Sequence, residues 1–170
     1  MTTIRSTMLR AFALLLLAAA VSACGFKLRG SDGQFNMPFK SIYLGFAVTS
    51  PLGTELKRNL RAVDTEVLEE AARAEALFDV LGETRGKSIL SLNAQGRVRE
   101  YLLTYTLVFR VRDRNGAELL KSTDISLKRS ITFNERQVLA NESEEALLYR
   151  DMQTDLVQQI LRRLAAIKPL

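Results

Sequence analysis

Hydrophobic and polar residues alternate most strictly between residues 98 and 112. Every second side chain there is apolar or aromatic, and the set comprises Tyr101, Leu103, Tyr105, Leu107, Phe109 and Val111. Because neighbouring side chains of a strand point to opposite faces, a period of two over this length predicts a long strand with one apolar face. We interpret the aromatic members of this set as core that packs beneath helices.

The intervening side chains of the same strand form a second face of mixed character. This face contains Thr104, Thr106, Val108 and Arg110. If the helices of the protein cover the first face, the second face stays open. A long and partly apolar open surface on a small protein indicates a site for a protein partner.

A hairpin should follow the long strand. The segment Asp113-Arg114-Asn115-Gly116 contains an Asn-Gly pair, which tolerates the positive φ angles of a tight turn. The next segment, residues 119–133, alternates again and carries on one side Leu119, Ile125, Leu127, Ile131 and Phe133. The two segments therefore predict a pair of long antiparallel strands.

Shorter strands are expected before the hairpin. Residues 41–46 predict the first of them, and residues 66–68 predict a second, followed by a helical turn or a loop. Residues 77–83 and 88–93 predict two more strands, with a turn flanked by the glycines at positions 82 and 86.

Two segments have helical periodicity and recognisable start signals. Ser50 suits the cap of a helix over about residues 51–61, in which proline takes the first position. Asn141 and Glu144 have the spacing of a capping box and predict a second helix that runs to about residue 167. The apolar stripe of this second helix is formed by Leu148, Tyr149, Met152, Leu156, Ile160, Leu164 and Ile167.

These elements together predict an α+β fold. Both helices need an apolar surface, and the long hairpin offers one. The simplest architecture is a two-layer sandwich, in which two helices pack on one face of a mixed β-sheet. We assign residues 39–170 to this single domain.

The start of the chain has the order of a secretory signal. A basic stretch precedes an apolar run, which ends in Val21-Ser22-Ala23-Cys24 and resembles a lipobox. A run of roughly a dozen residues is too short for a membrane span, which needs about 20, and a basic, uncapped N-terminus is a poor place for a buried helix. We predict a signal peptide over residues 1–23 and a lipidated N-terminal tether over residues 24–38. Cys24 would carry a covalent diacylglycerol and an N-acyl chain.

Composition narrows the possible functions. The chain has a net charge of +5, and removal of the signal with its two arginines leaves +3, without the block of basic residues that grips nucleic acid. Histidine is absent from the sequence, which removes the commonest general base and the commonest neutral metal ligand. We interpret two groups of glutamates as solvated residues on helix faces, namely Glu66, Glu69 and Glu70, and Glu142, Glu144 and Glu145. We therefore expect no catalytic residues, no metal site and no bound cofactor beyond the acyl chains.

Arg97 and Arg99 are the clearest candidates for binding an anion. They lie at the entrance to the long hairpin, where they could meet phosphates of a lipid. They could equally be ordinary solvated loop residues. A modest positive charge is compatible with contacts to an acidic glycolipid.

Three segments together resemble the LptE family of lipopolysaccharide-assembly lipoproteins. The first is Cys24-Gly25-Phe26-Lys27-Leu28-Arg29-Gly30, the second ends in Arg129-Ser130-Ile131-Thr132-Phe133, and the third runs over residues 144–164. The order of strands and helices fits as well, so the resemblance covers essentially the whole mature chain. Gly25 after the cysteine also agrees with sorting to the outer membrane.

The resemblance implies a protein without enzymatic activity. Members of the family sit as a plug inside the β-barrel translocon LptD, help it assemble and bind lipopolysaccharide. This protein would accordingly be lipid-anchored in the cell outer membrane, facing the periplasm within a barrel lumen. An accessory lipoprotein of another envelope machine, such as barrel assembly, or a periplasmic lipid-transfer module is the alternative.

The lipopolysaccharide-binding residues of the family cannot be carried over to this sequence one by one. The basic positions best known in the family correspond here to Ala94 and Asn141, which are not basic. From charge and location we infer four substitutes as candidates for lipopolysaccharide binding, namely Arg97, Arg99, Lys128 and Arg129.

Overall fold

The computed structural model describes residues 35–168 of the chain. The predicted signal peptide, Cys24 and most of the predicted tether therefore lie outside the described residues. The elements in chain order are β1 (Ser41–Leu44), α2 (Pro51–Ala62), β2 (Glu66–Leu68), the short 3-10 helix η1 (Ala71–Arg73), β3 (Ala76–Leu92), β4 (Val98–Asp113), β5 (Glu118–Thr132) and α3 (Val138–Ala165).

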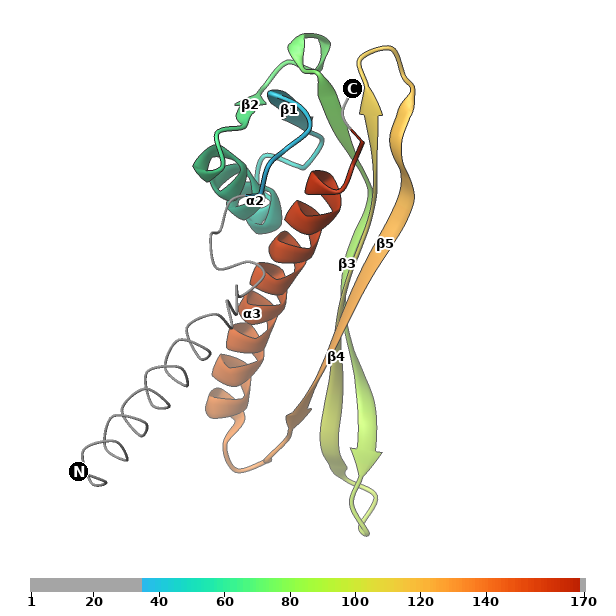
Figure 1. The fold of residues 1–170 in the computed structure, drawn as a ribbon. Helices are drawn as coiled ribbons and strands as arrows, with labels where there is room; N and C mark the ends of the chain where they lie inside the picture. Colours follow the sequence, from blue (N-terminus) through green and yellow to red (C-terminus); the bar gives the residue numbers. More distant parts are fainter. Residues whose placement is uncertain (1–34, 169–170) are drawn as a thin grey trace, which may run out of the picture. The chain divides into compact units, whose positions relative to one another are not determined.

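The strands form one mixed sheet in the order β2-β1-β3-β4-β5. The pairs of β1 with β2 and with β3 are parallel, whereas β3, β4 and β5 form an antiparallel meander. Both helices lie on the same side of this sheet (Figure 1). The predicted two-layer α+β sandwich, with two helices on one face of a mixed sheet, is therefore confirmed.

The long hairpin has the predicted faces. Leu103, Tyr105, Leu107, Phe109 and Val111 of β4 are fully buried. The alternate residues of the strand are only partly buried. Ile125 and Ile131 of β5 are also buried, and a tight turn joins the strands with Gly116 at φ 89°.

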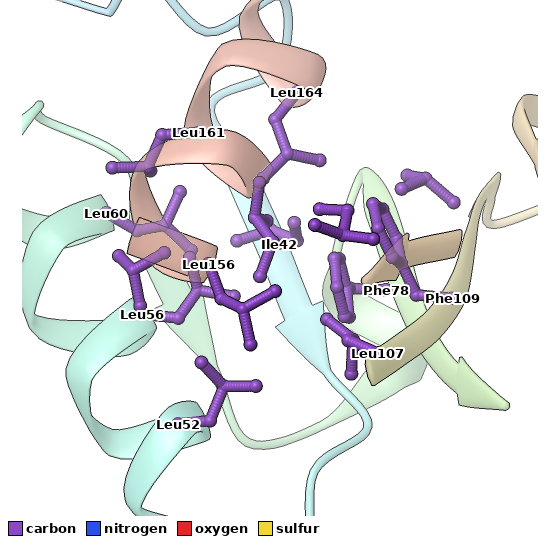
Figure 2. Close-up of a cluster of buried hydrophobic side chains, with 14 of the residues drawn as sticks. Ile42, Leu52, Leu56, Leu60, Phe78, Leu107, Phe109, Leu156, Leu161 and Leu164 are labelled. Carbon is purple, nitrogen blue, oxygen red and sulfur yellow. The ribbon is translucent and has the colours of Figure 1, made fainter. Parts of the chain in front are cut away.

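The main core lies where α2 and α3 meet the sheet. Leucines from both helices surround Ile42 of β1 and contact the sheet around Phe78 and Phe109 (Figure 2). All of these side chains are essentially inaccessible to solvent, and the leucines are Leu52, Leu56, Leu60, Leu156, Leu161 and Leu164. Burial of each such side chain stabilises the fold by about 1.5–3 kcal/mol before the cost of ordering it.

The prediction of two strands over residues 77–83 and 88–93 with a turn between them is wrong. The segment is one strand of 17 residues, β3. Gly82 and Gly86 lie inside it and pair with Val108 and Thr104 of β4. Glycine inside a strand often marks a bulge or a close approach, and both occur here. The register shifts between Val80 and Gly82, and a Cβ at Gly86 would lie 2.6 Å from the Thr104 hydroxyl.

The predicted start of the second helix also needs correction. Helix α3 begins at Val138, and its N-cap residue Gln137 makes no side-chain cap. Asn141 lies inside the helix, where its side-chain amide donates to the Asn134 carbonyl oxygen at 2.8 Å. The capping box is therefore absent, because Asn141 bridges to the preceding loop. The start of α2 is as predicted, since the Ser50 hydroxyl accepts from the Gly53 amide at 3.1 Å.

Candidate functional site

The open face of the sheet carries a compact group of charges at one end. Asp79 of β3 accepts from Arg110 at 2.9 Å and from two nitrogens of Arg112, at 2.5 and 3.1 Å. The Arg112 guanidinium holds the pKa of the Asp79 carboxyl below its ordinary value of 3.8. Further along the face, the hydroxyls of Thr106 and Ser126 lie 2.9 Å apart. Apolar residues lie between the polar residues of this face. Neither α2 nor α3 covers it (Figure 1).

Arg97 and Arg99 lie together at the end of the β3–β4 hairpin. Arg97 pairs with Glu135 of the loop before α3 at 2.9 Å, and its side chain remains 66% exposed. The Arg99 carbonyl accepts from the Phe133 amide at 2.9 Å, which places Arg99 opposite the end of β5. Both arginines are thus at one end of the domain.

Lys128 and Arg129 lie elsewhere on β5. They pair with Thr104 and Leu103 of β4. Leu103 and Thr104 are four and five positions along β4 from Arg99, or about 14 and 17 Å. Consecutive residues point to opposite faces, so Lys128 belongs to the open face, whereas Arg129 reaches Asp155 of α3 at 2.6 Å. The four predicted residues therefore do not form one cluster.

Exposed apolar side chains gather at the same end of the domain as Arg97 and Arg99. Three lie at the end of β3 and three in the first half of α3, namely Ile89, Leu90, Leu92, Val138, Leu139 and Leu147. Figure 1 shows the β3–β4 turn and the start of α3 at this common end. The sequence did not point to this group, because its members come from separate elements and only the fold unites them.

A polar network occupies the helix-facing side of β3. The Tyr105 hydroxyl donates to Glu83 at 2.6 Å and accepts from Arg85 at 3.0 Å. Arg85 also donates to Gln153 of α3 at 3.1 Å, and Gln153 donates to Glu55 of α2 at 2.6 Å. Burial, helped by the bond to Glu83, raises the pKa of Tyr105 to about 12. The network therefore joins both helices to the sheet through a tyrosine that stays protonated.

A groove of about 700 Å³ runs beside this network, between β3 and α3. Lys87 crosses it to Glu145 at 2.6 Å, and this bond raises the pKa of Lys87. The Tyr149 hydroxyl donates to the Gly86 carbonyl at 2.7 Å, and so closes part of the free edge of β3. None of these residues was predicted from the sequence to form a site.

Across residues 35–168, no group of three or more acidic, histidine or cysteine side chains is arranged to hold a metal ion. Within the same part of the chain, no helix has both the length and the apolar character needed to cross a bilayer.

Residues 39–164 match the family model for lipopolysaccharide assembly, LptE. The LPS-assembly lipoprotein LptE of Pectobacterium atrosepticum is 26% identical over 162 residues, which cover 93% of this chain and 86% of that protein.

Solved structures of lipoproteins share the fold. The solution structure of lipoprotein B from Nitrosomonas europaea is 39% identical, with a TM-score of 0.71, over 84% of this chain and 91% of that one. A minor lipoprotein from Acinetobacter baumannii is 26% identical, with a TM-score of 0.63, over 77% of this chain and 94% of that one. The chain therefore belongs to the LptE family, whose members are lipoproteins of lipopolysaccharide assembly in the cell envelope and not enzymes.

Proposed function

We propose that this protein is an outer-membrane lipoprotein that plugs the LptD β-barrel, helps it assemble and binds lipopolysaccharide on its way to the cell surface. Acylation of Cys24 would anchor it to the membrane. Membership of the family supports a role in lipopolysaccharide assembly. The surfaces of the domain support binding of the barrel and binding of lipopolysaccharide.

The main support for a barrel partner is that the helices cover only one face of the sheet. Both helices pack on one face, and the other keeps partly buried residues such as Val108 and Thr106 without a covering layer among the described elements. A stable protein complex buries more than about 1,000 Å² in total. The β3–β4–β5 meander, with strands of 17, 16 and 15 residues, offers a continuous face for such a contact.

The exposed end of the domain supports the binding of lipopolysaccharide. Apolar side chains such as Leu90 and Leu139 suit acyl chains there. Arg97 and Arg99, at the same end, suit phosphates by charge. An amphipathic lipid needs both kinds of contact within a short distance.

The proposal is tested by capture from cell envelopes. The tagged lipoprotein should co-purify with a large outer-membrane β-barrel. Thr106→Glu should reduce the captured barrel, because the new charge would be buried without a partner only in the complex. Thr54→Glu, on the exposed surface of α2, is the matched control and should capture as much barrel as the unchanged protein. Capture of a different envelope machine, or of no barrel, would contradict the proposal.

A further inference from the structure

The β4–β5 turn is closed by hydrogen bonds that all involve Asp113. Its amide donates to the Ala117 carbonyl oxygen at 2.9 Å, and its carbonyl oxygen accepts from the Gly116 amide at 3.1 Å. Its side-chain Oδ1 accepts from the amides of Asn115 and Ala117, both at 2.8 Å. Gly116 has a φ of 89°, which suits the only residue type without a Cβ.

The β3–β4 turn has the same hydrogen-bond pattern with different residues. The Asn93 amide donates to the Arg97 carbonyl oxygen at 2.8 Å, and the Gly96 amide donates to the Asn93 carbonyl oxygen at 3.0 Å. Asn93 Oδ1 accepts from the amides of Gln95 and Arg97, at 3.0 and 2.9 Å. In both turns, the first side chain therefore holds two amides through one oxygen.

The two turns differ in the side chain that precedes the glycine. This residue is Gln95 in the β3–β4 turn and Asn115 in the β4–β5 turn, and both are exposed to water. An asparagine before a glycine is chemically reactive, because glycine has no side chain to hinder attack by its own amide nitrogen. The ring that a glutamine would form is one atom larger and closes much more slowly. Of the two turns, only the one that contains Asn115 is open to this reaction.

The reaction needs no catalyst beyond water. The Gly116 amide nitrogen attacks the side-chain carbonyl carbon of Asn115, and the new C–N bond closes a succinimide ring. The side-chain nitrogen leaves as ammonia and takes with it the proton that the Gly116 nitrogen gives up. Water then opens the ring at either carbonyl, which yields aspartate or isoaspartate at position 115.

The closed turn opposes this attack. The N–H of Gly116, whose nitrogen must become the nucleophile, is held by the Asp113 carbonyl oxygen. The amide of Asn115 is held by Asp113 Oδ1, which fixes the main chain on the other side of the reactive side chain. Attack requires these bonds to break, so the rate depends on the fraction of molecules in which the turn is locally open.

We propose that Asn115 is a site of spontaneous deamidation, and that Asp113 protects it by keeping the β4–β5 turn closed. The Asn115 side-chain amide donates to Asp113 Oδ2 at 3.4 Å. After deamidation, a carboxylate would face the Asp113 carboxylate there, and isoaspartate would also add an atom to the main chain. The modified turn could not close as before, so a single opening event would damage this end of the hairpin irreversibly.

The first test follows position 115 of the full-length lipoprotein by mass spectrometry of its peptides at mildly alkaline pH. Conversion of Asn115 to the acid should be at least about tenfold slower in the folded protein than in urea. Asn115→Gln, which copies the β3–β4 turn, should show far slower conversion than asparagine in urea. Equal rates for Asn115 in the folded and the unfolded protein would overturn the proposal.

The second test isolates the role of Asp113. Asp113→Ala should accelerate conversion in the folded protein several-fold, because two amides lose their shared acceptor. Asp113→Asn should keep the slow rate, because Asn93 provides the same acceptor in the other turn. Asn93→Ala is the matched control and should leave the rate at Asn115 unchanged. An unchanged rate in Asp113→Ala, or an equal acceleration in Asn93→Ala, would refute protection by Asp113.

Discussion

At the scale of single residues, the centre of the sheet is packed around two aromatic rings. Phe109 of β4 is fully buried and stacks on Phe78 of β3, with 4.6 Å between the ring centroids and 13° between the planes. The neighbouring residue Val108 points to the open face and is only partly buried. Adjacent residues of one strand thus face entirely different environments.

Phe109→Ala should therefore lower the free energy of unfolding by about 3–5 kcal/mol, since it removes a buried ring and leaves a cavity. Val108→Ala, on the other face, should cost about 1 kcal/mol or less. Urea denaturation of the soluble, lipid-free domain measures both changes. A loss below about 1 kcal/mol for Phe109→Ala would show that the ring is not part of the core.

Asp79 gives the domain a defined sensitivity to acid. Its folded pKa lies below the ordinary value of 3.8, chiefly because of the hydrogen bond from Arg112. The ionised Asp79 carboxyl therefore stabilises the folded domain fully above about pH 4. This stabilisation is lost as the pH falls through the lowered pKa of the folded state. Asp79→Asn should be destabilising at pH 7 and nearly neutral near pH 2, as measured by thermal unfolding. An equal cost at both pH values would contradict this assignment.

At the scale of elements, local patterns explain which parts of the fold could be predicted. The alternation in β4, the Asn115-Gly116 turn and the apolar stripe of α3 are properties of neighbouring residues, and all were predicted. Strand β3 was divided in two because register shifts near Leu81 and Leu90 break its alternation. The glycines inside it also resemble a turn. Only pairing with β4 makes the segment one strand.

The candidate sites also divide into those that local patterns indicate and those that depend on contacts between distant residues. Charge and position along the chain indicated Arg97 and Arg99, and their role in binding lipid stays a prediction. Arg85 was missed because its partners Tyr105 and Gln153 are 20 and 68 residues away in the sequence. No local pattern reports an arginine held by such distant residues.

Helix α2 has one position at which helix propensity and packing oppose each other. A Cβ at the buried Gly53 would lie 2.7 Å from the Phe46 Cβ. Alanine gains about 1 kcal/mol of helix propensity over glycine, but Cβ of Phe46 is fixed to its backbone and cannot rotate away. Gly53→Ala should therefore be destabilising by about 1–3 kcal/mol. Arg58→Ala, on the exposed side of the same helix, should change stability by less than about 0.5 kcal/mol. A more stable Gly53→Ala protein would show that the packing adjusts freely.

At the scale of the whole molecule, the domain presents two kinds of surface to its surroundings. The open sheet face is broad and mixed, and the end that carries Arg97 and Arg99 combines exposed apolar side chains with arginines. If lipid binds at that end, the two functions can be separated by mutation.

Arg97→Glu combined with Arg99→Glu should lower the affinity for lipopolysaccharide several-fold, because reversed charges repel phosphate. The barrel complex should survive. Arg114→Glu combined with Lys121→Glu makes the same charge change at exposed positions near the opposite end of β4 and β5, and should leave affinity unchanged. Binding to immobilised lipopolysaccharide measures both. Equal losses for the two pairs would indicate a general effect of net charge.

The position of α3 after all the strands in the order of elements has a consequence for biogenesis. The β3–β4–β5 meander forms from contacts between consecutive strands, so it can assemble early. Its apolar face needs Leu156, Leu161 and Leu164, which are synthesised after the strands. Until α3 docks, Leu103, Tyr105, Leu107 and Phe109 remain uncovered on a sheet with free edges, a state that favours aggregation. We therefore expect the nascent protein to need holding chaperones until α3 has been synthesised and has docked. A shortened α3 should leave part of this apolar face uncovered permanently.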